Sequence, residues 1–455
     1  MRQKLAEETI IFVSVLKWFI LATIIGSIVG LATVLFLKAL NWSSLQTSAY
    51  NYYYLLLPVA FFISALTIKY IAPDAEGHGT EKVIEAVHKR AGRIKPAVVP
   101  VKLFTTVITI ASGGSAGKEG PCAQIGAGLS SIFSDILRMG DVDRKKLVIC
   151  GISAGFAAVF GTPIAGAMFG IEVLFVGGLV YDVLLPSFIA GITAYHVSTS
   201  LGITYFYHPM HFVPVFSELF FIKVAVAGVF FGICSFLLIE SLKIFKQLSE
   251  KIKVWTPLKG IIGGCSLILL TLIFSKDFLG LGLDKIEYTL QGVSPPWYSF
   301  IMKIIFTSIT LTFGGSGGIV TPIFFIGVTS GSLFANIFHL DVGTFAAIGM
   351  VSLLAGATNT PIAASIMAVE LFGPRIAPYA AVSCVICFLM TGHRSVYPSQ
   401  VFAISKSPSL AIDIGKEEED IMTRVTLRDK GFIRFALNIV LKIKKILFSQ
   451  GDKLE

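Results

Sequence analysis

The sequence predicts an all-α, polytopic membrane protein built from two repeated sets of discontinuous helices. Three observations lead to this fold class. The chain is 54% hydrophobic and only 14% charged, whereas an ordinary soluble domain carries about 25% charged residues. Apolar runs close to the length of a membrane span recur along it. Glycines and prolines interrupt many of these runs, and two motifs occur twice in the same order.

The apolar content is the first of these observations. A soluble protein cannot bury so much apolar surface, because its outer face must remain wet. A span needs ~20 apolar residues, and suitable runs lie at 20–37, 55–71, 220–239 and, shorter, 261–274. The run at 10–40 is too long for the apolar part of a signal peptide, so we expect it to span the membrane.

The charges lie between the apolar runs. The net charge is +9, and the basic clusters are Lys89, Arg90, Arg93 and Lys95; Arg138, Arg144, Lys145 and Lys146; and Arg424, Arg428, Lys430, Arg434, Lys442, Lys444 and Lys445. Basic loops between spans follow the positive-inside rule, so we expect a multi-pass protein of the plasma membrane with cytoplasmic N- and C-termini. No soluble basic face is indicated, which argues against a nucleic-acid partner.

Two motifs are duplicated. Gly-Gly-Ser-Ala-Gly-Lys-Glu-Gly-Pro at 113–121 matches Gly-Gly-Ser-Gly-Gly-Ile-Val-Thr-Pro at 314–322, with an offset of 314 − 113 = 201. Thr-Pro-Ile-Ala at 162–165 with Glu172 matches the same four residues at 360–363 with Glu370, with an offset of 198. Duplicated halves with broken helices are typical of transporters whose site lies at the repeat interface.

This duplication divides the chain. We expect a cytoplasmic N-terminus at 1–14, a first transmembrane repeat at 15–202, a link at 203–214 and a second repeat at 215–393. A final pore-lining segment follows at 394–415, and a short basic cytoplasmic tail at 416–455. Apolar and basic residues alternate at helical spacing at 432–448, which is compatible with a helix on the inner leaflet or a solvated helix.

Three predicted helices that begin directly after glycine-rich turns are the candidate functional elements. Gly-Lys-Glu-Gly-Pro at 117–121 precedes a helix expected from Cys122 toward Ile136, and similar starts lie at 317–322 and 77–81. Helix N-termini offer unpaired N–H groups and a positive dipole end, so backbone donors at Gly79 and Gly120 can build an anion cage. A P-loop is excluded, because Ser112 replaces its first glycine and an acid follows its lysine.

Glu119 stands at one of these helix starts. A carboxylate there can occupy the place of an anion and leave when it is protonated or displaced. An acidic residue at membrane depth indicates function, although a carboxylate that only caps the helix is the simpler alternative.

These motifs and their order resemble the CLC family of chloride channels and chloride/proton antiporters over about residues 15–405. The resemblance implies a homodimer with one pore in each protomer and an inverted repeat of helices, many of them tilted or discontinuous. It implies that Glu119 is the external gate, and that the backbone N–H groups of Ile319 and Val320 bind the central anion. Tyr397 would add a phenolic donor, while Lys102 and Lys118 would raise the local potential. The tail is too short for the paired CBS domains of some members.

The chain departs from the family pattern at three positions. His78 stands where the family often has an anion-binding serine; its imidazole can still donate and titrate near neutral pH, or it simply packs beside the entrance. Val320 replaces the usual phenylalanine. The internal glutamate of proton-coupled members is replaced by Val173, which leaves Glu172, one residue earlier, as the candidate for proton transfer.

We therefore expect transport of chloride or a similar small anion, gated by Glu119, with weak or no obligatory proton coupling. The alternative is a proton-coupled antiporter with a non-standard internal route. A membrane-embedded enzyme is disfavoured because the histidines are scattered, and a cation or amino-acid transporter of another fold is a further alternative. The expected partners are the anion, protons if coupling occurs, lipid and a second copy of the chain. No cofactor or metal is expected, and the six cysteines fit the core.

Overall fold

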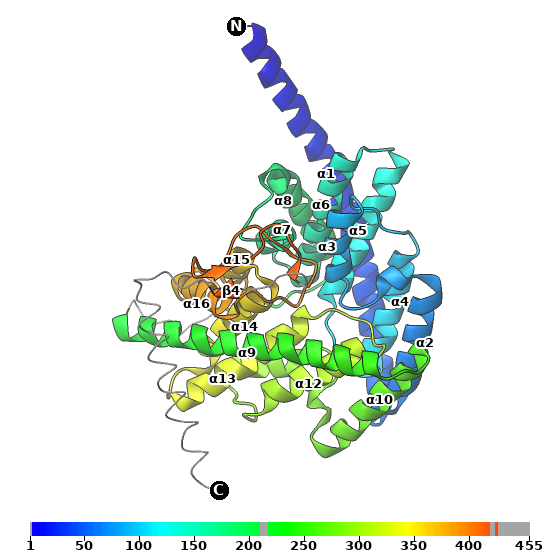
Figure 1. Ribbon diagram of the computed structural model, residues 1–455, viewed down its shortest axis with the longest axis vertical. Helices are drawn as coiled ribbons and strands as arrows, with labels where there is room; N and C mark the ends of the chain where they lie inside the picture. The colour runs from blue at the N-terminus through cyan, green and yellow to red at the C-terminus, as the bar shows by residue number, and fades with distance from the viewer. Residues whose placement is uncertain (1, 210–216, 419–423, 426–455) are drawn as a thin grey trace.

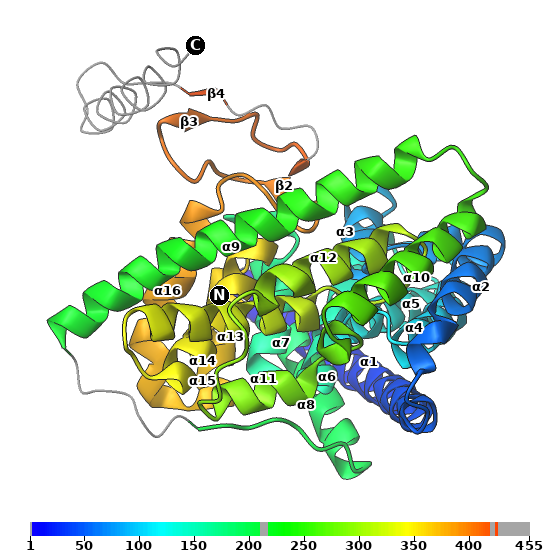
Figure 2. The same cartoon turned by 90° about the horizontal axis from the view of Figure 1, so that it is seen from below.

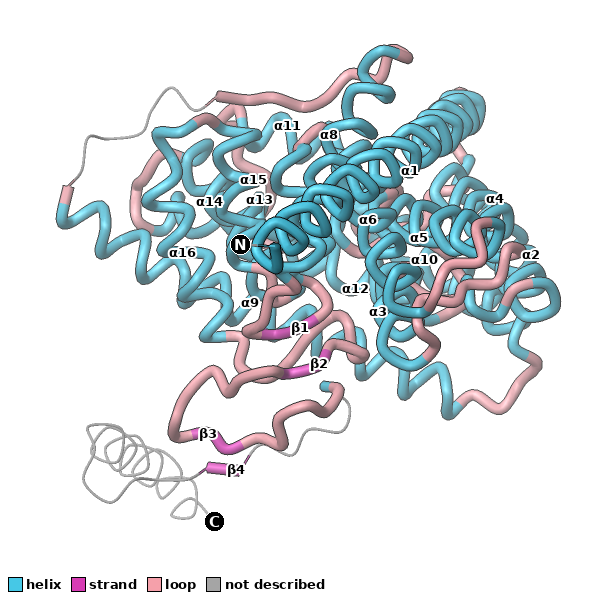
Figure 3. Tube along the Cα trace, turned by 90° about the horizontal axis from the view of Figure 1, so that it is seen from above, coloured by secondary structure: helices cyan, strands magenta, loops and turns pink. Residues whose placement is uncertain are grey.

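The structure is a computed structural model that describes residues 2–209, 217–418 and 424–425. Sixteen α-helices make up most of this part, and four strands of two residues each lie together at one edge (Figure 3). The expected all-α membrane class is confirmed. Within the described residues, five helices are long and apolar enough to cross a membrane.

The helices form two series of eight. The first is α1 (Arg2–Ser48), α2 (Leu57–Ile71), α3 (Thr80–Lys89), α4 (Val98–Ala111), α5 (Glu119–Ile136), α6 (Asp141–Phe160), α7 (Pro163–Glu172) and α8 (Leu184–Ser200). The second is α9 (Glu218–Lys251), α10 (Thr256–Ile273), α11 (Leu283–Leu290), α12 (Ser299–Thr312), α13 (Val320–Ile337), α14 (Val342–Thr358), α15 (Pro361–Phe372) and α16 (Ala377–Met390). The starts of α4 and α12 differ by 299 − 98 = 201, as do those of α5 and α13 (320 − 119).

The two series meet at the duplicated glycine motifs. Gly117 and Gly318 form an antiparallel bridge in which each N–H donates to the other's carbonyl at 2.6 Å. On either side, the Ser115 N–H donates to the Thr310 hydroxyl and the Ser316 N–H to the Thr109 hydroxyl, both at 3.0 Å. Such reciprocal bonds relate the two halves by a local two-fold axis, as expected for a duplicated fold.

The helices that begin at the duplicated glycine motifs lie inside the molecule, and others lie on its surface. Helix α13 is buried over most of its length, whereas α2 and α10 expose large apolar residues such as Leu55, Leu56, Leu269 and Leu272 near and along them. Lipid accepts exposed apolar side chains, and broken backbone is stable at membrane depth only where protein covers it. Helix α1 begins at Arg2 and projects from the body (Figure 1), so the region expected as a separate N-terminus at 1–14 continues directly into the first long helix.

After α16 the chain turns back along the helices. Strand β2 (Val401–Phe402) pairs in parallel with β1 (Phe175–Val176), which directly follows α7, and β3 (Leu410–Ala411) pairs with β4 (Arg424–Val425). Strands β2, β3 and β4 lie beyond α9 in Figure 2. Short 3-10 helices are η1 (Tyr53–Leu56), η2 (Pro73–Ala75), η3 (Tyr181–Val183), η4 (Lys276–Phe278) and η5 (Pro374–Ile376). Residues outside the described part of the chain include the end of the expected link with the first two residues of the expected second repeat (210–216). They also include most of the tail (419–423 and 426–455), with its stretch at 432–448.

Candidate functional site

Glu119 is the first residue of α5, and its side chain reaches the start of α13. Its carboxylate accepts a hydrogen bond from the Thr321 backbone N–H at 3.1 Å and another from the Thr321 hydroxyl. Glu119 is 1% exposed. Because Thr321 lies in the first turn of α13, the carboxylate occupies the positive N-terminal end of the helix from the other repeat, where an anion would be stabilised.

Three helix N-termini meet around this carboxylate. Ile319 caps α13 and Val320 begins it, and both are completely buried. Gly79 precedes α3 with a φ of 83°, and a Cβ there would lie 2.9 Å from the Gly120 carbonyl carbon. A Cβ on Gly120 would in turn collide with the His78 carbonyl oxygen. Glycine is therefore required where α3 and α5 touch, and the structure brings these predicted site residues together.

His78 and Tyr397 face each other beside these helix ends. Their ring centroids are 6.0 Å apart. Among the described residues, neither the buried His78 Nδ1 nor the Tyr397 hydroxyl has a hydrogen-bond partner; Thr80 approaches the hydroxyl without normal hydrogen-bond geometry. Buried polar atoms are nearly always satisfied in native proteins. An anion between the two rings would accept from the hydroxyl and from a protonated Nδ1.

The two predicted lysines lie in different surroundings. Lys102 is fully buried in α4, and its ammonium donates to the carbonyls of Ala75 at 3.1 Å and Gly77 at 2.6 Å. It thereby holds the loop that leads to His78 and places a positive charge behind it. Lys118 is half-buried at the start of α5, next to Glu119.

Glu172 contacts the second repeat at a different helix from Glu119. Its two carboxylate oxygens accept from the N–H groups of Ile362 at 3.0 Å and Ala363 at 2.8 Å, at the start of α15. The equivalent residue of the second repeat, Glu370, accepts from the N–H groups of Ile164 at 2.9 Å and Ala165 at 2.8 Å, at the start of α7. Each glutamate thus satisfies two N-terminal donors of the opposite helix.

Local patterns do not predict the roles of two residues at the site and of one in the equivalent place of the second repeat. Thr321 lies in the second glycine motif, which predicts backbone donors but not a role for its hydroxyl. Gln124, in α5, is 1% exposed and donates to the Asp74 carbonyl at 2.7 Å, and its Oε1 lies beside Gly79. Lys303 follows Lys102 by the repeat offset of 201, which was the signal that could have identified it.

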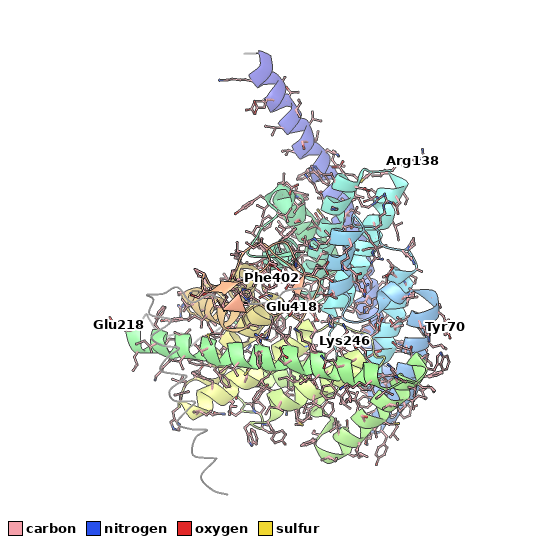
Figure 4. The ribbon with its side chains drawn as sticks, in the orientation of Figure 1. Tyr70, Arg138, Glu218, Lys246, Phe402 and Glu418 are labelled. Atoms are coloured by element: carbon pink, nitrogen blue, oxygen red, sulfur yellow. The ribbon has the colours of Figure 1, made fainter. Side chains whose placement is uncertain are left out.

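A polar hollow of about 670 Å³ opens beside α9 and the segment after α16. It is lined by Glu240, Lys243, Lys246, Gln247, Glu250, Gly392, His393, Arg394, Leu410 and Glu418, of which Figure 4 labels Lys246 and Glu418.

Known proteins share this sequence and architecture. The family described as "Voltage gated chloride channel" matches residues 59–392. A chloride/fluoride channel protein of Pseudomonas syringae pv. tomato is 34% identical over 86% of this chain and 87% of its own length. An H(+)/Cl(-) exchange transporter ClcA of Klebsiella pneumoniae is 28% identical over 77% of this chain and 80% of its own.

Solved structures agree with this match. A CLC-type fluoride/proton antiporter superposes with a TM-score of 0.81 at 28% identity and covers 85% of this chain and 98% of its own. A slow cyanobacterial Cl-/H+ antiporter superposes with a TM-score of 0.72 at 20% identity over 82% of this chain and 94% of its own, which supports the fold. The family's members are transporters or channels and not enzymes. The chain therefore belongs to the CLC family and is a multi-pass membrane transporter of small anions.

Proposed function

We propose that this chain moves chloride or a similar small anion past the N-termini of α3, α5 and α13, that Glu119 gates the path, and that proton coupling is weak or not obligatory. One observation carries the proposal. The Glu119 carboxylate lies at the N-terminus of α13, bonded to the Thr321 N–H and hydroxyl, so a carboxylate already fills an anion position.

The gate follows from charge. A protonated Glu119 loses its charge attraction to the positive end of α13, so an anion displaces it more readily and takes its place. The anion then meets backbone donors from Gly79, Gly120, Ile319 and Val320, together with the side chains of His78 and Tyr397. Lys102 and Lys118 raise the potential along the path without contacting the anion, as a nearby fixed charge does in a region of low dielectric constant.

The residues at the expected internal proton position, Val173 and Glu172, support weak proton coupling. A proton needs titratable stations or a water chain to cross protein interior. Val173 cannot carry a proton, and Glu172 uses both oxygens to accept from α15. Glu370 makes the same bonds in the opposite repeat, which favours a structural role for both glutamates.

A proton-coupled antiporter is the second candidate. It is supported by the names of similar proteins, which include an H(+)/Cl(-) exchange transporter and a fluoride/proton antiporter. The name of the Pseudomonas relative joins chloride and fluoride, so fluoride belongs among the anions to be tested. In this case the proton would use Glu172 or water on the inner side.

Sealed vesicles that contain the purified protein test the gate and the coupling. We expect Glu119→Gln to keep anion flux and lose most of its pH dependence, while Glu287→Gln, an exposed control on α11, behaves like the parent. Flux of unchanged size and pH dependence in Glu119→Gln would remove Glu119 from the gate. A chloride or fluoride gradient that drives protons uphill would establish the antiporter, and loss of that pumping in Glu172→Gln would identify its inner station.

We further propose a homodimer in the plasma membrane with two separate pores and cytoplasmic termini. Helices α7 and α15 pack against each other, and each exposes an isoleucine, Ile164 (45%) and Ile362 (42%). Small residues along both helices allow close packing against another helix. Cross-linking in membranes should capture a dimer. Recovery of monomer alone would contradict this assembly.

A further inference from the structure

The segment around Tyr397 is attached firmly to the second repeat and to α7. Gln400 is fully buried, and its amide N–H groups donate to the carbonyls of Val173 at 2.7 Å and Thr358 at 2.8 Å, at the ends of α7 and α14. Its carbonyl accepts from Asn359 at 3.1 Å and Ser395 at 2.5 Å. With its side-chain hydrogen bonds satisfied in this way, Gln400 fixes the backbone three residues after the tyrosine.

The residues before Tyr397 are fixed as well. The Tyr397 N–H donates to the Ser395 hydroxyl at 2.9 Å, and the Val396 N–H donates to the Ala357 carbonyl at 2.9 Å. The pairing of β2 with β1 follows directly after Gln400. The backbone that carries the tyrosine ring is therefore fixed to α7 and α14.

His78 depends on a different element. It lies in the loop that opens α3, and Lys102 holds this loop from α4. The separation of the two rings, 6.0 Å between centroids, therefore depends on how α3 is seated against the Tyr397 segment.

Glu81, in the first turn of α3, makes that connection. Its Oε1 accepts from the Ser399 backbone N–H at 3.1 Å and from the Ser399 hydroxyl at 2.5 Å. Ser399 is 6% exposed and lies two residues after the tyrosine. One carboxylate oxygen thus receives two hydrogen bonds, and charge-assisted bonds of this kind are among the stronger ones in proteins.

We infer that Glu81 is a positioning residue that sets the distance between His78 and Tyr397, and thereby the selectivity of this site among small anions. The inference rests on the proposed anion site and deepens it. Donors that differ by about half an ångström from the productive geometry change recognition, and chloride, bromide and nitrate differ in size and shape. Glu81 acts through the two rings and does not touch the anion.

Paired substitutions separate position from charge. Glu81→Ala removes the acceptor, and we expect the nitrate-to-chloride flux ratio to change about fivefold, the factor that one typical hydrogen bond is worth. Glu81→Gln keeps an oxygen that accepts from Ser399, so its ratio should remain near that of the parent. Ser399→Ala, a milder change that keeps the backbone N–H, should shift the ratio in the same direction as Glu81→Ala. Glu85→Ala, one turn later in a partly exposed pair with Lys82 at 3.0 Å, is the matched control and should change nothing.

The same measurements in a Tyr397→Phe background test the route of the effect. If Glu81 acts by placing the rings, Glu81→Ala should no longer alter the ratio once the hydroxyl is absent. Equal effects of Glu81→Ala with and without the hydroxyl, equal effects of Glu81→Gln and Glu81→Ala, or no effect of Glu81→Ala and Ser399→Ala would each overturn the inference. If Tyr397→Phe and His78→Ser themselves leave the ratio and the flux unchanged, the proposed anion site fails instead.

Discussion

The two repeats share one backbone arrangement, but they place different side chains at its centre. In the first, Lys102 holds the loop before α3 through the carbonyls of Ala75 and Gly77. In the second, Lys303 holds the loop before α11 through Phe278 at 3.1 Å and Gly280 at 2.9 Å. Gly79 and Gly282 follow in these loops with φ values of 83° and 72°. The backbone and its buried lysine are thus duplicated.

The side chains at the centre of the two halves are not. His78 and Gln124 in the first half correspond to Leu281 and Phe325 in the second, at offsets of 203 and 201. The Phe325 ring lies beside Gly282, just as Gln124 lies beside the equivalent Gly79. A Cβ on Gly282 would approach the ring at 2.7 Å. Polar side chains line one end of the scaffold, where we propose that the anion binds, and an aromatic ring occupies the equivalent place at the other end. Duplication therefore supplies the frame, and a few side chains distinguish its two ends.

The largest effect should come from making the first half resemble the second. Gln124→Phe places a ring beside Gly79, and we expect anion flux to fall by about tenfold or more, because overfilling a packed site costs ~1–3 kcal/mol. The reverse change, Phe325→Gln, should reduce thermal stability and leave the flux near that of the parent. A Gln124→Phe protein that transports normally would break the comparison.

The two buried lysines should separate function from stability. Lys102→Met and Lys303→Met each leave two carbonyls without their donor, so both should lower the free energy of unfolding by ~1–3 kcal/mol. Only Lys102→Met also removes a positive charge behind His78, and its flux should fall about fivefold more than that of Lys303→Met, as a loss of ~1 kcal/mol implies. Thermal unfolding in detergent and vesicle flux measure the two effects. Equal losses of flux would mean that both lysines act only on the fold.

A smaller effect is expected at His78. His78→Ser should change selectivity among chloride, bromide and nitrate by about threefold, because a donor at the site moves and changes strength by less than one hydrogen bond. Leu281→Ser, the control at the equivalent position of the second repeat, should leave the selectivity unchanged. Identical selectivity of His78→Ser and the parent would favour simple packing of the imidazole.

The smallest and most symmetrical effect concerns Glu172 and Glu370. A carboxylate at a helix N-terminus contributes ~0.3–1 kcal/mol, and more when it is buried. Glu172→Gln and Glu370→Gln should therefore reduce stability by similar amounts and alter anion flux by less than about twofold. A large loss of flux in Glu172→Gln alone would show that the two halves differ here too.

Several parts of this arrangement were predictable from local patterns. The Gly-Lys-Glu-Gly-Pro motif indicates a helix N-terminus with an acid beside it, because those residue types suit few other conformations. The start of α5 was nevertheless placed at Cys122 and lies three residues earlier, at Glu119. The link between Glu81 and Ser399 joins residues 318 apart in the sequence, and no local pattern connects them.

By itself, the sequence determined that this protein is an all-α membrane transporter with a duplicated, glycine-broken core, because apolar content, span length and repeat offset are properties of the chain. Only the tertiary structure decided what the Glu119 carboxylate contacts, since Thr321 comes from the other repeat. It also decided that Glu172 accepts hydrogen bonds from the start of α15 and that Glu81 accepts them from the segment after Tyr397. These contacts exist because the inverted repeat turns helix N-termini from both halves toward one another, and that meeting depends on packing between distant segments.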